Sequence, residues 1–166
     1  MESLVTWFTI HLSEYISREA IVFVISLMPI LELRGGLLAA SLLQVPIATA
    51  IPICVVGNIL PIPFILLFIK KIFAWMRRFA PFAKLVDWLE NKAMSKSDKI
   101  SSIEFWGLML FVGIPIPGTG AWMGSLIAAL LDIDWKKAIL AELLGICLAT
   151  VIMSFVSYGL LGAILS

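Results

Sequence analysis

Apolar stretches separated by short polar or Pro/Gly-rich breaks run along most of this chain. Residues 20–31 are apolar, but a helix of that length rises roughly 18 Å, too little for the roughly 30 Å hydrocarbon core of a bilayer. A second short apolar run, 37–43, follows the polar and glycine-rich segment 32–36. The stretch 47–69, which Pro52, Pro61 and Pro63 should kink, is long enough to cross a membrane. The first half therefore predicts two short arms and one full span.

The second half repeats this plan 88 positions later. Pro29 aligns with Pro117, Gly36 with Gly124 and Gly57 with Gly145, and these matches are informative because proline and glycine act on the backbone. The repeat predicts short arms at 105–116 and 121–131, a break at 117–120 and a long span over roughly 138–165. Paired interrupted segments in two halves of a membrane protein are typical of a transporter's binding site.

Two topologies fit the plan: each pair of arms is either a re-entrant hairpin or one broken helix that crosses. Residues 70–104 hold eight of the twelve Lys and Arg, for a net charge of +4, and the remainder carries −3. The positive-inside rule makes this segment cytoplasmic. Re-entrant hairpins place Lys136 and Lys137 on the same side, so the rule favours them. Both termini then face away from the cytoplasm, and the two halves are inverted.

The predicted fold is therefore an all-α integral membrane protein with two inverted repeats, each a re-entrant helical hairpin followed by a transmembrane helix. Residues 1–166 form one domain, with repeats at 20–69 and 105–166. Residues 1–19 predict an N-terminal amphipathic interfacial helix, because their polar side chains share one helical stripe. A composition of 61% hydrophobic residues and a mean hydropathy of +1.08 exclude a soluble domain. The predicted location is the cytoplasmic membrane, as a multi-pass protein.

The basic linker 70–104 mixes aromatic residues with Lys and Arg, which suits a helix on the anionic cytoplasmic leaflet. Nucleic acid is a poor alternative, because the segment is tethered to the bilayer at both ends. Cys54 and Cys147 are interpreted as buried small hydrophobes. The sequence shows no metal-binding cluster and no nucleophile–base pair, so neither a cofactor nor an enzymatic activity is expected.

Four polar side chains, Glu32, Arg34, Asn58 and Glu142, fall at membrane depth. Such groups are costly and indicate function. Glu32 and Arg34 form either a structural ion pair at the tip of the first hairpin or a substrate site, in which Arg34 offers a planar fork of donors for phosphate. Asn58 is expected to make an interhelical hydrogen bond.

The break Gly118–Thr119–Gly120 precedes a predicted helix from Ala121. The N-terminus of that helix is a candidate anion site. Thr119 is expected to cap the helix and to contact the substrate, two roles that are compatible. Trp122 stands where the first repeat has Arg34 and can stack on a cation.

Glu142 stands where the first repeat has Cys54, so it breaks the symmetry of the repeat. Burial disfavours its charged form, which makes it a proton-coupling candidate together with Glu32. The alternatives are pairing with Arg34 and an interfacial position near Lys137.

Small residues at helical spacing predict close packing of the hairpins, back to back at the centre. The predicted hairpin-packing residues are Pro29, Gly35, Gly36, Pro117 and Gly124.

The stretches PILELRGG at 29–36 and GIPIPGTGAW at 113–122 resemble the two signature stretches of the small multidrug export family. The resemblance covers roughly residues 20–165, and that family is similar to the wider DedA/VTT superfamily. It implies a transporter-like fold with inverted repeats. Its DedA relatives are linked to moving phospholipids or polyprenyl phosphates, although this chain lacks the longer Arg/Pro signature of DedA proper.

The leading hypothesis is a transporter or flippase for an anionic amphiphile such as a lipid or polyprenyl phosphate. Arg34 and the backbone of 118–120 would hold the head group, and Glu32 or Glu142 would exchange a proton. One alternative is a proton-coupled exporter of small cationic drugs, which would use Glu32, Glu142 and Trp122. Another is a membrane scaffold without transport. The expected partners are membrane lipids, the substrate and protons or another coupling ion, and a homo-oligomer is left open.

Overall fold

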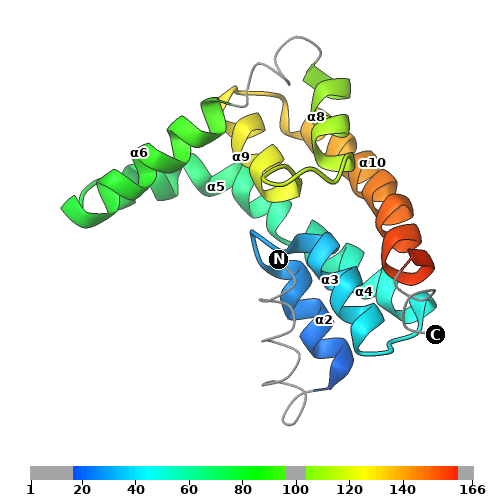
Figure 1. Cartoon of the computed structure of the whole chain (residues 1–166). Helices are drawn as coiled ribbons and strands as arrows, with labels where there is room; N and C mark the ends of the chain where they lie inside the picture. The colour runs from blue at the N-terminus through cyan, green and yellow to red at the C-terminus, as the bar shows by residue number, and fades with distance from the viewer. Residues whose placement is uncertain (1–16, 96–103, 161–166) are drawn as a thin grey trace. The chain divides into compact units, whose positions relative to one another are not determined.

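The computed structural model of the protein describes residues 17–95 and 104–160, which form helices joined by short turns and loops (Figure 1). The predicted all-α class is confirmed for this part of the chain. The amphipathic helix predicted over 1–19 lies almost entirely outside it. The helices are α2 (Arg18–Leu27), α3 (Glu32–Leu42), α4 (Ile47–Ile59), α5 (Pro61–Met76), α6 (Ala80–Met94), α8 (Glu104–Gly113), α9 (Ala121–Leu130), α10 (Trp135–Ser154) and the π-helix η1 (Phe155–Leu160).

The chain divides into two compact units. Unit 1 contains α2, α3, α4 and the end of the last helix from Ile146 onward. Unit 2 runs from Pro61 to Gly145 and contains α5, α6, α8, α9 and the first half of α10. Each unit is therefore built from residues of both sequence repeats.

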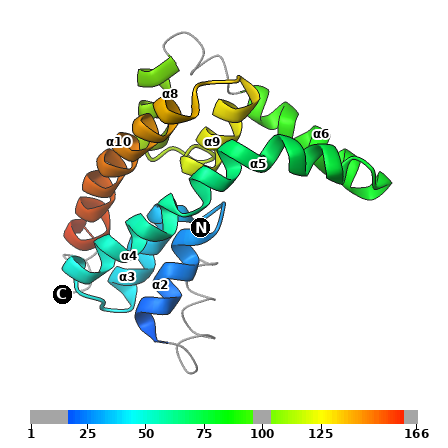
Figure 2. The ribbon, with the colours of Figure 1, turned by 180° about the vertical axis from the view of Figure 1, so that it is seen from behind.

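In unit 1, α2 and α3 form a helical hairpin, and α4 packs against both (Figure 2). The Nη1 of Arg18, at the start of α2, donates a hydrogen bond of 3.2 Å to the carbonyl of Leu43, just after the end of α3. This bond fixes the arms as antiparallel. Ser17 begins the hairpin, because its Oγ accepts from the N–H of Ala20 in the first turn of α2.

The second arm, α3, begins earlier than the sequence predicts. The prediction placed residues 32–36 in the break, whereas the structure has the break at 28–31 and both Gly35 and Gly36 inside α3. Close packing explains the difference: a Cβ on Gly36 would overlap the Ser26 hydroxyl and lie 2.9 Å from the Cys54 sulfur. The glycines lower the helix propensity of α3, but they let α2 and α4 approach it.

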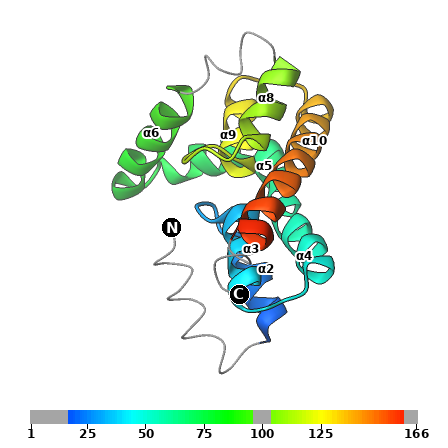
Figure 3. The ribbon, with the colours of Figure 1, turned by 45° about the vertical axis from the view of Figure 1, so that its right-hand side comes forward.

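In unit 2, α8 and α9 form a second hairpin, joined by residues 114–120 (Figure 3). Its packing also depends on a glycine. A Cβ on Gly124 of α9 would lie 2.8 Å from Val112 and 3.2 Å from Leu108, both on α8. The observed arms agree with the predicted arms to within three residues, and α5 and α6 cover α9.

The spacing of 88 residues recurs in the backbone. Gln44 and Asp132, which follow the two second arms, both have left-handed conformations, with φ of 58° and 56°. In each case the N–H of the following residue donates a hydrogen bond to a carbonyl of the preceding helix. Val45 N lies 2.9 Å from Ala40 O, and Ile133 N lies 3.0 Å from Ala128 O. These are the bonds of a Schellman C-cap, so both hairpins end in the same way.

Within the described ranges, two helices are long and apolar enough to cross a membrane: Ile47–Met76, which joins α4 to α5, and Trp135–Gly159. The first is interrupted at Leu60, because Pro61 cannot donate the next helical hydrogen bond. The second begins three residues before the predicted start, because the carboxylate of Asp134 accepts from the N–H groups of Lys136 and Lys137.

Each hairpin is tied to the long helix of the other repeat. In unit 2, Lys70 Nζ lies 2.6 Å from the carboxylate of Asp132. In unit 1, the hydroxyl of Tyr158, 88 positions after Lys70, donates to Val45 O at 2.8 Å. The Ser41 hydroxyl adds a 2.7 Å bond to the carbonyl of Ser157.

Gly145→Ala should destabilise the protein by about 1–3 kcal/mol, because extra bulk in a packed core strains its neighbours. The new Cβ would lie 2.7 Å from the carbonyl of Met109 and 2.8 Å from the Cβ of Val112. Gly159→Ala is the matched control, since nothing lies within 4 Å of its Cβ position. Thermal unfolding in detergent should show a lower Tm for the first variant and not for the second. Equal Tm values would contradict the close approach of α8 and α10.

Candidate functional site

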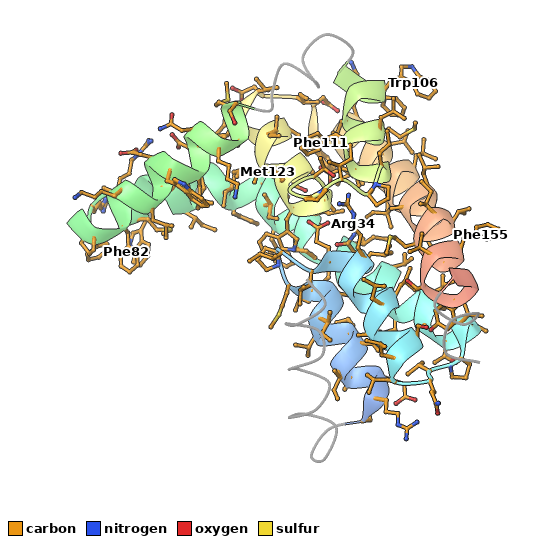
Figure 4. The ribbon with its side chains drawn as sticks, viewed as in Figure 1. Arg34, Phe82, Trp106, Phe111, Met123 and Phe155 are labelled. Atoms are coloured by element: carbon orange, nitrogen blue, oxygen red, sulfur yellow. The ribbon has the colours of Figure 1, made fainter. Side chains whose placement is uncertain are left out.

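Glu32 and Arg34 are two ionisable side chains that are both buried in the first turn of α3. Glu32 acts electrostatically on Arg34, and Figure 4 shows Arg34 at the N-terminal end of the helix. Glu32 also has a φ of 50°, in the left-handed region that residues other than glycine rarely occupy. Strained backbone of this kind is concentrated at functional sites. The tip of the first hairpin therefore combines buried charge with strain.

Asn58 of α4 lies level with this pair. Helices α3 and α4 are antiparallel neighbours, and Gly36 faces Cys54. One turn further, the same register brings Glu32 level with Asn58. Asn58 is buried, and its Oδ1 has no hydrogen-bond partner among the described residues. The predicted interhelical hydrogen bond is therefore not made by that oxygen within this part of the chain.

In unit 2, Glu142 is fully buried and bound by Ser125, whose hydroxyl donates a 2.8 Å hydrogen bond to Oε2. Lys137 is exposed and Glu142 is not, and the alternative of a carboxylate near the membrane interface stays a prediction. A Cβ on Gly124 would lie 3.6 Å from Glu142 Oε1, so Glu142 faces Gly124 as Cys54 faces Gly36.

Sequence reasoning missed Ser125. It is fully buried and follows the packing glycine Gly124, in an arm where the first repeat has Leu37. The sequence signal that could have identified Ser125 is its polar side chain at a position where the first repeat has the apolar Leu37. The Ser125–Glu142 bond is thus a feature of the second half only.

The break of the second hairpin is held by Thr119. Its Oγ1 lies 2.8 Å from Ile116 O and 3.1 Å from Ile114 O, so the hydroxyl fastens the turn. The predicted capping role is wrong, because the N-cap of α9 is Gly120, which has no side chain to offer. Gly118 and Gly120 have φ of 78° and 128°, conformations that favour glycine.

The remaining predicted residues lie on or beside these hairpins. Trp122 is half-buried in the first turn of α9, and Pro29 and Pro117 are exposed in the two turns. Cys54 is buried as predicted, but Cys147 is exposed on α10, where an apolar surface suits a weakly polar thiol. Among the described residues, no three His, Cys, Asp or Glu side chains gather into a metal site.

The structure brings some of the predicted residues together. Glu32, Arg34 and Asn58 share unit 1, whereas residues 118–120, Trp122 and Glu142 share unit 2. We predicted that Arg34 and residues 118–120 bind one head group, and alternatively that Arg34 pairs with Glu142. Each of these contacts would join residues of different units, so both stay predictions. The faces of Gly36 and Gly124 are occupied by helices of their own unit, and a back-to-back meeting of the hairpins stays a prediction.

The comparison with family models assigns this chain. The family described as "Putative small multi-drug export protein" matches residues 32–152, which include Glu32, Arg34, the break at 118–120 and Glu142. The comparisons with curated proteins and with solved structures found no match. Because the matched range covers most of the sequence and every charged site residue described above, the chain belongs to this family of small multidrug export proteins.

Proposed function

We propose that this protein is a membrane transporter whose substrate binds at the tip of the first hairpin, beside Arg34 and Glu32. The observation that carries the proposal is the burial of two ionisable side chains, Glu32 and Arg34, in the first turn of α3. Buried ionisable groups in apolar helical hairpins are expensive and mark substrate or ion pathways. The two long apolar helices and the export family support a membrane transporter over other classes.

The proposed substrate is an anionic amphiphile, such as a lipid or polyprenyl phosphate. Arg34 supports this class because its guanidinium keeps its charge and presents a planar fork that matches phosphate oxygens. Asn58, level with Glu32, adds a buried amide for further hydrogen bonds. The resemblance of the family to the DedA superfamily favours the same class, and the activity is then that of a flippase.

The second candidate is proton-coupled export of small cationic drugs. The family description favours it, and so does Glu142, a fully buried carboxylate that can take up a proton. In this version Glu32 and Glu142 attract the cation and Trp122 stacks on it. A scaffold without transport is the third candidate, and an uptake assay separates it from both.

The proposed topology has two re-entrant hairpins in inverted repeats, in a multi-pass protein of the cytoplasmic membrane. The bond between Arg18 and the Leu43 carbonyl supports it, because it holds the entry and the exit of the first hairpin together. A single helix that crosses the membrane would instead separate these ends by the thickness of the bilayer.

Cysteines placed at Ser166 and at Ser97 test the topology in intact cells. An impermeant thiol reagent should label Ser166→Cys and leave Ser97→Cys unlabelled, in a background with Cys54 and Cys147 replaced by alanine. Permeabilised cells provide the control, where both positions should react. Failure to label Ser166→Cys in intact cells, with labelling after permeabilisation, would favour crossing helices.

Arg34→Lys should reduce uptake of a fluorescent lipid phosphate into reconstituted liposomes by more than tenfold, because a point charge replaces the bidentate fork. Arg34→Ala should abolish uptake and leave a folded protein, since Glu32 can protonate when its neighbour is removed. Glu32→Gln and the double variant Arg34→Ala/Glu32→Gln complete the set, with Tm measured beside uptake.

A purely structural pair gives a different pattern. Arg34→Ala would then lower the Tm strongly, because a buried charge loses its partner, and the double variant would recover both Tm and uptake. That result would show that Arg34 has a structural role and does not bind the substrate, and it would contradict the proposal of an anionic substrate. Uptake of a cationic dye by the wild-type protein, with no uptake of the lipid phosphate, would favour the drug exporter.

Glu142→Gln should uncouple transport from the proton gradient while the protein stays folded, because the amide oxygen still accepts from Ser125. Ser125→Ala should lower stability by about 1 kcal/mol, the usual size of an interhelical hydrogen bond in a membrane. Cys54→Ala, at the equivalent position of the first repeat, is the control and should leave coupling unchanged. The measurement is liposome uptake with and without an imposed pH gradient. An unchanged response in Glu142→Gln would exclude Glu142 as the coupling group.

A further inference from the structure

One side of α6 is apolar and uncovered. Phe82, Leu85 and Trp88 follow each other at intervals of three residues and are 47%, 44% and 54% exposed. Val86 and Ala93 are fully buried on the side of α6 that contacts α5 and α9. Figure 4 shows Phe82 projecting from the N-terminal end of the helix. The apolar arc of α6 therefore extends well beyond the face that packs within unit 2.

The apolar surface continues onto the end of α5. The rings of Trp75 and Phe79 are 5.2 Å apart and meet edge to face, and Phe79 meets Phe82 in the same way at 6.4 Å. All three rings are exposed by about half of their surface. We call residues 70–94, with this row of aromatic side chains, the α5–α6 platform.

The platform carries excess positive charge. The guanidinium of Arg77 binds the carboxylates of Asp87 and Glu90, and these hydrogen bonds, to Asp87 first, raise the pKa of Arg77. Both acids of the platform are thus bound by one base, in a cluster whose net charge is −1, and Lys70 is paired with Asp132, so the four other bases leave the platform with a net charge of +3. Four cations remain that belong to no ion pair of the described residues, although Lys92 lies 4.5 Å above the Trp88 ring. They are Lys71, Arg78, Lys84 and Lys92.

Helix α6 is too short and too charged to cross a bilayer itself, since its 15 residues rise roughly 22 Å. It follows a candidate span directly, because α5 ends the apolar helix Ile47–Met76. The platform therefore stands where a span leaves the hydrocarbon core. We infer that the α5–α6 platform binds anionic phospholipid head groups, with its aromatic row in the membrane interface and Lys71, Arg78, Lys84 and Lys92 against the lipid phosphates.

Charge favours lipid over a second copy of the chain as the cover of this surface. A two-fold contact would bring the same four cations of both copies together, and like charges repel. A bilayer supplies both apolar depth for Phe82 and Trp88 and phosphate for the cations. The inference rests on the location in a membrane and not on what is transported, so it can fail or hold apart from the transport proposal.

Lipid-dependent melting of the full-length protein tests the charges. Phosphatidylglycerol added to the detergent-solubilised protein should raise the Tm, because a ligand of the folded state stabilises it, and phosphatidylcholine should not. The triple variant Lys71→Gln/Arg78→Gln/Lys84→Gln should lose affinity for phosphatidylglycerol by roughly fivefold for each charge removed. Replacing Lys71 and Lys84 by Arg is the matched control and should keep the increase. An unchanged increase in the triple variant would overturn the inference, as would an equal effect of inorganic phosphate.

Fluorescence quenching tests the aromatic row. With Trp88 as the sole tryptophan, the others being changed to Phe, reconstituted protein should be quenched by nitroxide-labelled phosphatidylcholine and protected from aqueous iodide. Quenching is measured in vesicles of phosphatidylcholine with phosphatidylglycerol. Quenching by iodide alone would show a solvated face. Protection from both quenchers would show that a second copy or another protein covers the platform, and either result would overturn the inference.

Discussion

The close approach of helices at one glycine in each hairpin is the constraint on which the remaining structure depends. A Cβ at Gly36 would collide with Ser26 and Cys54, and a Cβ at Gly124 would collide with Val112. Lipid tails compete with apolar side chains for every helix surface, so helices in a membrane are held by backbone proximity and dispersion rather than by the hydrophobic effect. The glycine sets the register in which each second arm meets its long helix, and that register decides which side chains are brought to the tip.

The same frame carries different chemistry in the two halves. Glu32 and Gly120 both have positive φ at the start of a second arm, but one adds a buried carboxylate and the other adds none. Cys54 faces the packing glycine Gly36 in the first half, and Glu142 faces Gly124 in the second half. The Ser125 hydroxyl donates a hydrogen bond to Glu142. The backbone conformations recur at the spacing of 88 residues, whereas the side chains at corresponding positions differ. The charged groups are accordingly divided, with the permanent charge in one unit and the buried carboxylate of α10 in the other.

The sequence predicted the arms, the breaks and the long helices, because apolar length and Pro or Gly punctuation are local signals. It placed Gly35 and Gly36 in a break, because glycine interrupts a helix unless a neighbouring helix needs the space, and neighbours are not visible locally. Thr119 was predicted to cap α9, but the carbonyls of the turn itself compete for a hydroxyl. The partner of Glu142 depends on register between helices, so Ser125 could only be found in three dimensions.

The two hairpins are held to the other repeat's long helix by different kinds of polar contact. Unit 1 includes the C-terminal part of the second repeat's long helix, and unit 2 includes α5, the C-terminal part of the first repeat's long helix. Each hairpin is therefore packed with residues of both repeats. The first hairpin makes two partly buried hydrogen bonds between neutral groups to the long helix of the second repeat, one through Ser41 and one through Tyr158. Each contributes about 1 kcal/mol to the free energy of unfolding. The described tie of the second hairpin is the Lys70–Asp132 pair, whose side chains are 46% and 83% exposed. Exposed ion pairs of this kind contribute about 0–1 kcal/mol and weaken with salt. This ion pair is only part of what holds the second hairpin, because α9 also packs against α5, the end of the first repeat's long helix.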